Sequence, residues 1–188
     1  MSAGEHPRKE QHATEQHATE QHAEQLAVPP CPGCGLVAEP AEGPVHAYIG
    51  ASPGCWARFG ELTVLGLAGV PSGYLAGDTY AVQHPGEPER RAIQSVGVHL
   101  VTLCALLERD WPAEKAIALR RQVVDHPPEP WPRLEVPWPV GHVTVADVLA
   151  APPPGERDER IRAWAVDVWS VYAPHQDRIR GWLDSALG

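Results

Sequence analysis

The chain has 188 residues, with 24 acidic and 15 basic side chains, so its formal net charge is −9. This charge argues against a nucleic-acid-binding protein that relies on a basic surface, because neutralising phosphates requires clustered Lys and Arg. No apolar run approaches the roughly 18–20 residues of a membrane span, and the first residues lack the apolar stretch of a secretory signal. We therefore expect a cytoplasmic protein without nucleic-acid or membrane partners.

Residues 1–26 differ in composition from the rest, and we interpret them as a disordered tail. A five-residue unit occupies residues 10–24 as EQHAT, EQHAT and EQHAE. Its period matches neither a helix nor a strand, and it offers no large apolar side chain to bury. A metal-binding tract is the alternative, but His12, His17 and His22 would not share one face of a helix. Residues 27–188 are predicted to form a single globular domain.

The globular part begins with a helix and a short extended segment. Ser52 followed by Pro53 is typical of a helix start, and the spacing of apolar residues predicts a helix to about residue 67. The interval Thr79–Gln83 is interpreted as extended, because a turn at His84-Pro85-Gly86 follows it. His84 would then occupy this turn and face any site built at that end of the molecule.

A central helix and a proline-rich strap come next. Residues 90–109 are apolar on nearly every side, as expected of a core helix, and another helix is predicted over about 113–124. The stretch HPPEPWPRLEVPWPV at 126–140 cannot be regular helix because of its prolines. We expect it to be an extended strap that three side chains pin to the core: Trp131, Leu134 and Trp138.

The C-terminal third predicts two further helical regions. Thr144 and Asp147 have the spacing of a capping box, which begins a short helix ending near Ala150. A long final helix carries an apolar stripe and is interrupted by Pro174. The sequence thus predicts a mainly α fold, a single-domain helical bundle with long proline-rich connections.

The most informative short motif is Cys31-Pro32-Gly33-Cys34, a zinc-knuckle-like turn near the N-terminus. Proline and glycine favour a tight turn that directs two thiolates towards one ion. A thioredoxin-type redox pair is less favoured, since no helix-forming stretch follows the motif. An unliganded turn is the third interpretation. No second CxxC pair occurs, so a zinc site would need ligands from elsewhere in the chain.

Several residues are candidates to complete that site. Cys55 falls at the predicted helix start, where the helix dipole favours a thiolate. His46 lies nine residues before it, across a Gly/Ser/Pro turn, and His84 occupies the later turn. The candidate ligands are therefore Cys31, Cys34, Cys55, His46 and His84, with His99 and His175 as secondary candidates. Cys104 lies in an apolar stripe and is interpreted as core.

Six segments together resemble a bacterial family of unknown function. They are CPGCGL, HAYIGASPGCW, AVQHPG with RRAIQSVGVHL, and the C-terminal WAVDVW and HQDRIRGWL. The resemblance covers about residues 29–187 and implies a single-domain protein, without implying an activity, substrate or partner. The positions that match the family's motif residues are Cys31, Cys34, His46, Cys55, His84, His99 and His175.

Three functions are compatible with these observations. The first is a zinc-binding protein whose metal is structural. The second is a metal- or thiol-dependent enzyme, hydrolase-like, in which His46, His84 and other histidines gather in a cleft or Cys55 is a nucleophile. The third is a protein-interaction module that uses tryptophans of the strap. The expected partner is an unidentified protein or a small molecule.

Overall fold

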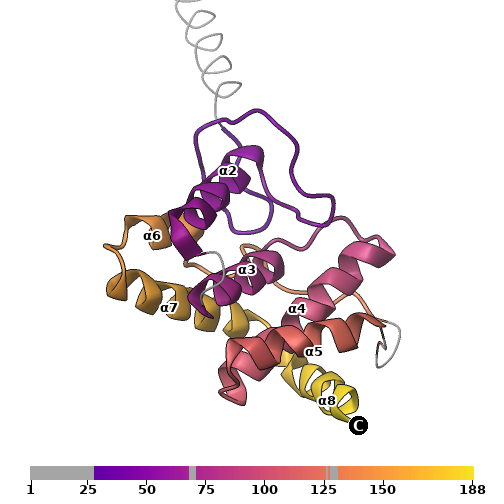
Figure 1. Ribbon diagram of the computed structural model, residues 1–188. Helices are drawn as coiled ribbons and strands as arrows, with labels where there is room; N and C mark the ends of the chain where they lie inside the picture. The colour runs from indigo at the N-terminus through magenta and orange to yellow at the C-terminus, as the bar shows by residue number, and fades with distance from the viewer. Residues whose placement is uncertain (1–27, 68–70, 126, 128–130) are drawn as a thin grey trace, which may run out of the picture.

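The computed structural model describes residues 28–188 except 68–70, 126 and 128–130 (Figure 1). These described residues contain no β-strand and form seven α-helices. A π-helical turn, η1 (Thr63–Leu67), and a 3-10 turn, η2 (Ala173–His175), complete them. The mainly α fold predicted from the sequence is confirmed, while the predicted tail at 1–26 lies outside the described residues. The helices are α2 (Pro53–Leu62), α3 (Pro71–Gln83), α4 (Arg90–Glu108), α5 (Ala113–Asp125), α6 (Val145–Ala150), α7 (Gly155–Val171) and α8 (Gln176–Leu187).

Helix α4 forms the centre of the core and packs against α3, α5 and α8. A helix surrounded in this way needs apolar residues on most of its surface. In the described part of the chain, α4 is the one helix long and apolar enough to cross a membrane by length and composition, and half of the relevant window is buried inside the protein. The expectation of no apolar run near membrane-span length is therefore wrong for α4, whose composition is that of a central core helix.

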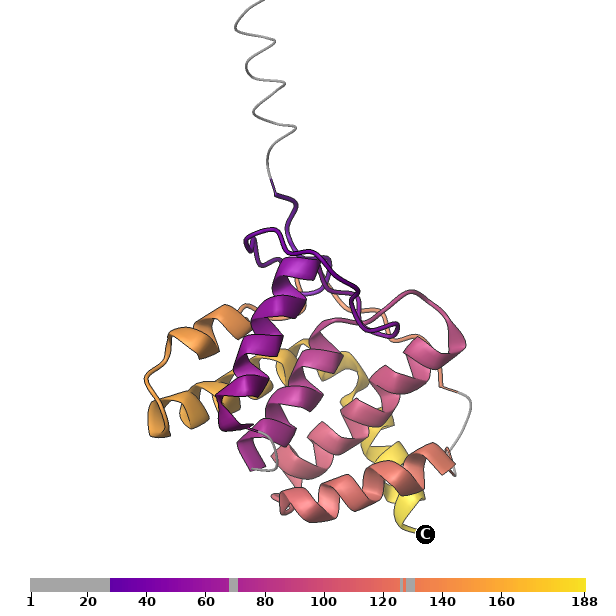
Figure 2. The ribbon, with the colours of Figure 1, turned by 45° about the horizontal axis from the view of Figure 1, so that its top comes forward.

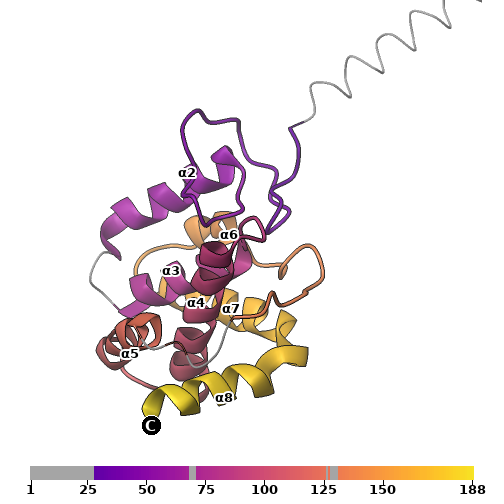
Figure 3. The same cartoon turned by 90° about the vertical axis from the view of Figure 1, so that its right-hand side faces the viewer.

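The segment from residue 28 to the start of α2 lies at one end of the molecule, and α8 lies at the other (Figures 1 and 3). Helix α2 packs against α6, and α6 against α7. Helix α3 packs against both α4 and α7, so it connects the N-terminal end to the core. Figure 2 shows α2, α3, α4 and α5 following one another across one side of the molecule.

The prediction of an extended segment at Thr79–Gln83 is wrong, because these residues form the last part of helix α3. Residues from Asp78 to Gln83 are all buried, because η1, α4, α5 and α7 all contact α3. Burial on all sides removes the polar face from which a helical period is recognised. The predicted helix to residue 67 is also shorter than expected, since η1 replaces its end and leaves Leu65 53% exposed.

The predicted helix boundaries after α4 agree with the structure. Thr144 and Asp147 form the capping box at the start of α6. The chain leaves helical geometry at Pro174, where η2 separates α7 from α8. The apolar stripes of both helices are buried: Ile161, Trp164, Ala165 and Val168 in α7, and Ile179, Trp182, Leu183 and Ala186 in α8.

The proline-rich strap has no helix or strand at its described residues, 127 and 131–140. Trp131 lies against Gly97 of α4, where any added Cβ would collide with the indole ring. The same indole packs edge-on to Trp182, with ring centroids 4.7 Å apart. Trp138 is 60% exposed, so the expectation that it pins the strap to the core is wrong.

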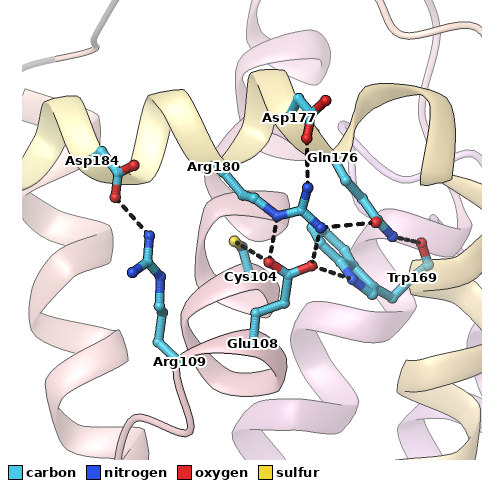
Figure 4. Close-up of polar contacts among 8 residues, drawn as sticks. All are labelled: Cys104, Glu108, Arg109, Trp169, Gln176, Asp177, Arg180 and Asp184. Atoms are coloured by element: carbon cyan, nitrogen blue, oxygen red, sulfur yellow. Dashed lines mark hydrogen bonds and ion pairs between the residues drawn. The ribbon is translucent and has the colours of Figure 1, made fainter.

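A polar cluster joins α8 to α4 (Figure 4). Arg180 donates through Nε and Nη2 to the two carboxylate oxygens of Glu108, at 2.7 and 2.8 Å. The Trp169 indole donates to the same carboxylate at 3.2 Å. Cys104 is fully buried as predicted, and its thiol lies 3.8 Å from Glu108. These contacts fix the C-terminal helix against the central one.

Candidate metal centre

Four side chains converge where the N-terminal segment meets α2 and α3. They are Cys31, Cys34, Cys55 and His84, and their sulfur and nitrogen donor atoms all lie within 4.8 Å of one another. Cys34 is 4% exposed and the other three are fully buried. Two of these side chains come from the coil before α2, one from the first turn of α2 and one from the residue after α3. The fold thus gathers three separate segments at one dry locus.

The turn from Cys31 to Cys34 is closed by backbone hydrogen bonds. Gly35 N–H donates to Cys31 O and Cys31 N–H donates to Leu36 O, both at 2.9 Å. Gly35 has φ +75°, a conformation that glycine adopts without steric cost. At Gly33 an added Cβ would lie 2.5 Å from His84 Cδ2. Glycine is therefore required for the turn to approach the imidazole.

The first turn of α2 positions Cys55 and also contacts Cys31. Ser52 caps the helix, and its hydroxyl accepts a hydrogen bond from Cys55 N–H at 3.3 Å. Ser52 N–H in turn lies 3.5 Å from Cys31 Sγ. A backbone amide directed at sulfur stabilises a thiolate. The helix start that the sequence predicted therefore positions one thiol and provides a donor to another.

His84 directly follows the last residue of α3, is fully buried and faces the three cysteines. Its ring stacks on Tyr80 with centroids 4.0 Å apart. Its Nδ1 lies 2.8 Å from Tyr80 O, and since a carbonyl only accepts, Nδ1 carries the proton. Nε2 is then free as a donor atom for a metal and lies 3.4 Å from Cys55 Sγ. A hydrogen bond of this kind from the second ring nitrogen is typical of metal-binding histidines.

The spacing of the donor atoms fits a tetrahedral ion. Zinc binds thiolate at about 2.3 Å and imidazole at about 2.0–2.1 Å. In a regular tetrahedron these bond lengths place two sulfurs about 3.8 Å apart, and sulfur about 3.6 Å from nitrogen. The corresponding distances here are 3.7 Å between Cys34 Sγ and Cys55 Sγ, and 3.4 Å between Cys55 Sγ and His84 Nε2. An ion could enter with little rearrangement.

The three thiols lie close enough together to perturb one another's ionisation. Hydrogen bonds from the Cys34 and Cys55 thiols lower the pKa of Cys31 far below its ordinary value. The hydrogen bond to Cys31 raises the pKa of Cys34 to about 12, and the same interaction raises that of Cys55 further. Three thiolates side by side in a buried pocket require a cation to offset their repulsion. The donor set is thus suited to a divalent ion.

The comparison with known families covers most of this chain. Residues 29–173 match the model of a family described as "Family of unknown function (DUF5946)". The chain belongs to this family. No curated protein and no solved structure matches it. The family assignment confirms the resemblance found in the sequence, and the matched DUF5946 region contains all four residues of the cluster.

The remaining candidate histidines of this DUF5946 chain lie apart from the cluster. His46 is exposed, and its Nδ1 accepts a hydrogen bond from Tyr48 N–H at 3.3 Å. His175 Nε2 donates to Glu135 O at 2.8 Å, so it holds the strap beside the start of α8. The structure does not bring His46, His99 and His175 together with His84, as the predicted cleft of histidines would require.

His99 belongs to a separate charged cluster between α3, α4 and α5. Asp78 Oδ1 lies 2.6 Å from His99 Nδ1 and 2.6 Å from Arg120 Nη2. The Asp78 side chain is fully buried, and His99 is 22% exposed. No local pattern indicates this cluster, because Asp78 lies in the part of α3 that is buried on all sides. Its contacts are those of a buried ion pair that joins three helices.

Sequence reasoning also missed Tyr80 and Gln83, which support the cluster from α3. Tyr80 O–H donates to Cys55 Sγ at 3.4 Å, and burial raises the pKa of this phenol well above its ordinary value. Gln83 donates to the carbonyls of Val140 and Val143, each at 2.8 Å, and accepts from the Trp164 indole at 2.9 Å. The residue before His84 is thus fixed by two distant segments. The local pattern that could have indicated Tyr80 is its four-residue spacing from His84, which places two side chains on the same face of a helix.

Proposed function

We propose that this is a zinc-binding protein whose metal is structural, held by Cys31, Cys34, Cys55 and His84. The observation that carries the proposal is the convergence of four buried donor atoms within 4.8 Å. A tetrahedral zinc ion bound by four protein side chains has no open position for water or substrate, which is the mark of a structural site.

The chemistry of the donors favours zinc. Three thiolates and one imidazole form one of the recurrent ligand sets of structural zinc. Calcium and magnesium prefer oxygen ligands, which this cluster does not provide. None of the four cysteines, all of which the structure describes, is in a disulfide. Free thiols support a reducing compartment such as the cytoplasm.

The metal would fasten the N-terminal segment to the helical body. Residues 28–52 contain no helix or strand, so their position depends on turns, caps and ligands. The ion joins this coil to the start of α2 through Cys55 and to the end of α3 through His84. Binding free energy at such a site contributes directly to folding.

Elemental analysis of the purified chain tests the proposal. We expect about one zinc per chain, and loss of the metal in Cys31→Ser, Cys34→Ser, Cys55→Ser and His84→Ala. Cys104→Ser is the matched cysteine control, because Cys104 is equally buried but contacts Glu108. His46→Ala is the matched histidine control, and both controls should retain zinc.

Two results would contradict the structural role. The first is a metal content that the four ligand variants leave unchanged. The second is a metal-free protein with the same melting temperature as the metal-bound one. A different metal in stoichiometric amount, such as iron with its visible absorption, would preserve the site but overturn its assignment to zinc.

A further inference from the structure

A cavity of about 210 Å³ lies between α4 and the strap, apart from the metal ligands. Ile93, Val96 and Leu100 of α4 line one side, and Leu134 and Val136 of the strap line another. Trp138 contributes aromatic surface, since it lines the cavity and is 60% exposed, whereas Tyr172 and Trp182 lie beneath the lining at 1% and 3% exposed. The cavity is partly open to solvent, so a small molecule could reach it from the surface.

The strap spans the cavity because it is held at separate points. At one end Trp131 lies against Gly97. At the other, Val140 N–H donates to Gly33 O at 2.9 Å. Between them His175 holds Glu135 O, and Pro132, Pro137 and Pro139 prevent the strap from coiling into a helix. The cavity is thus formed by the fold itself and does not depend on an occupant.

The lining selects against charged molecules. Its charged residues are Arg133 and Glu135, which pair with each other at 3.4 Å and are 55% and 82% exposed. The rest of the lining is uncharged. A charged molecule in the interior would lose hydration without gaining a buried counter-charge. An uncharged molecule would not incur this cost.

We propose that this cavity binds a small neutral molecule built on a single substituted aromatic ring. An apolar cavity of about 150 Å³ is known to accept benzene, so the volume here admits one ring with a few additional atoms. Trp138 offers aromatic surface for ring contacts, and Ile93 and Val96 of α4 offer aliphatic surface. None of the four proposed zinc ligands lines the cavity, but the strap is held to the Cys31–Cys34 turn through Gly33, so binding is tested on the metal-bound chain.

Fluorine NMR with three rings of matched size tests the proposal on the full-length, metal-bound chain. The probes are 4-fluorotoluene, which is neutral, 4-fluorobenzoate, which is anionic, and 4-fluorobenzylamine, which is cationic at neutral pH. We expect saturable line broadening with the neutral ring and at least tenfold weaker binding of both charged rings. Equal binding of all three would overturn the assignment to neutral ligands.

Two variants locate the binding. Val96→Phe should fill the cavity and weaken binding of 4-fluorotoluene at least tenfold. Val64→Phe is the control, because Val64 is 83% exposed and lies on η1, and it should bind as the wild type does. Equal loss in both variants, or no loss in Val96→Phe with its fold intact by circular dichroism, would show that the ring binds elsewhere.

A measurement on the wild-type chain avoids dependence on the folding of Val96→Phe. Methyl resonances of Ile93, Val96 and Leu100 should shift on addition of 4-fluorotoluene. Methyl groups of Leu62 and Val148, which are fully buried but do not line the cavity, should not. Shifts at the second set alone, or at neither set, would overturn the proposal.

Discussion

Gly33 lies where the turn between Cys31 and Cys34 meets the ring of His84. An added Cβ would come 2.5 Å from His84 Cδ2 and 2.6 Å from Gln83 O. We expect Gly33→Ala to displace the turn, weaken zinc binding at least tenfold and lower the melting temperature. Competition with a zinc-binding dye measures the affinity, and thermal unfolding measures the stability.

Gly60→Ala is the matched control for that change. Gly60 lies inside α2, and an added Cβ would meet nothing within 4 Å. Alanine in place of glycine within a helix stabilises by up to about 1 kcal/mol, so this variant should bind zinc normally and melt no lower than the wild type. A Gly33→Ala protein that behaves like Gly60→Ala would show that the turn tolerates a side chain.

Asp78 gives a second prediction at the scale of single residues. Its Oδ1 accepts hydrogen bonds from both His99 and Arg120 in a buried position. Asp78→Asn removes the negative charge that these donors face, and we expect a loss of about 2 kcal/mol in the free energy of unfolding. Urea denaturation measures this loss. Asp184→Asn, which disrupts an exposed pair with Arg109, should change stability by less than about 0.5 kcal/mol, and equal effects would contradict the importance of burial.

At the scale of elements, the contact between α4 and α8 depends on pH. The hydrogen bond from Arg180 holds the pKa of Glu108 below its ordinary value of 4.5. A carboxylate with a lowered pKa in the folded state stabilises fully above the unfolded value, and this stabilisation is lost as the pH falls through the folded value. The wild type should therefore melt at a higher temperature than Glu108→Gln at pH 7. The difference should shrink progressively below about pH 4.5.

Melting temperatures of both proteins across a pH series test this statement. Glu61→Gln is the control, because Glu61 pairs with Arg58 on the exposed surface of α2 and should have little effect at any pH. A stability difference for Glu108→Gln that persists unchanged into acid would show that the side chain contributes through packing rather than through its charge.

The elements also show how far sequence patterns predict this fold. Helices α4, α7 and α8 were predicted because each has a recognisable apolar surface or stripe, and α6 because of its capping box. Helix α3 was missed because its last six residues are buried whatever their polarity. Asp78 and Gln83 there owe their burial to partners on α5 and α7, and no local pattern reveals such partners.

In the candidate site, too, the local motif was predictable from the sequence, while the residues brought in by packing were not. The motif from Cys31 to Cys34 indicates a pair of candidate metal ligands, since the turn between them is local, but it leaves a redox pair and an unliganded turn as alternatives. Cys55 and His84 were candidates among several, because the choice between His84 and His46 depends on how α3 packs. The supporting contacts of Tyr80 and Gln83 could not be predicted without placing Thr79–Gln83 in a helix.

For the whole molecule, removal of the metal should release the N-terminal end without unfolding the core. Hydrogen exchange after chelation tests this. Amides whose hydrogen bonds depend on the site should lose protection, among them Cys31, Gly35 and Val140. Amides in the buried middle of α4, such as Leu103, should remain protected. Uniform loss of protection would show that the metal stabilises the entire fold, and no loss would contradict a structural role.

Helix α7, which packs on α3, lies far along the chain from the four proposed ligands, and this distance in sequence affects the order of assembly. All four ligands lie within the first 84 residues, but α7 and the residue after it complete the surroundings of His84, through Trp164 to Gln83 and Tyr172 to Val82. During synthesis the thiols therefore emerge from the ribosome long before their final cover. An ion captured at that stage would be bound before α7 docks on α3. Its later exchange would require the N-terminal coil to open, because this coil carries Cys31 and Cys34 while α7 contacts α3. The lifetime of the bound metal should therefore follow the rate of opening at residues 28–52.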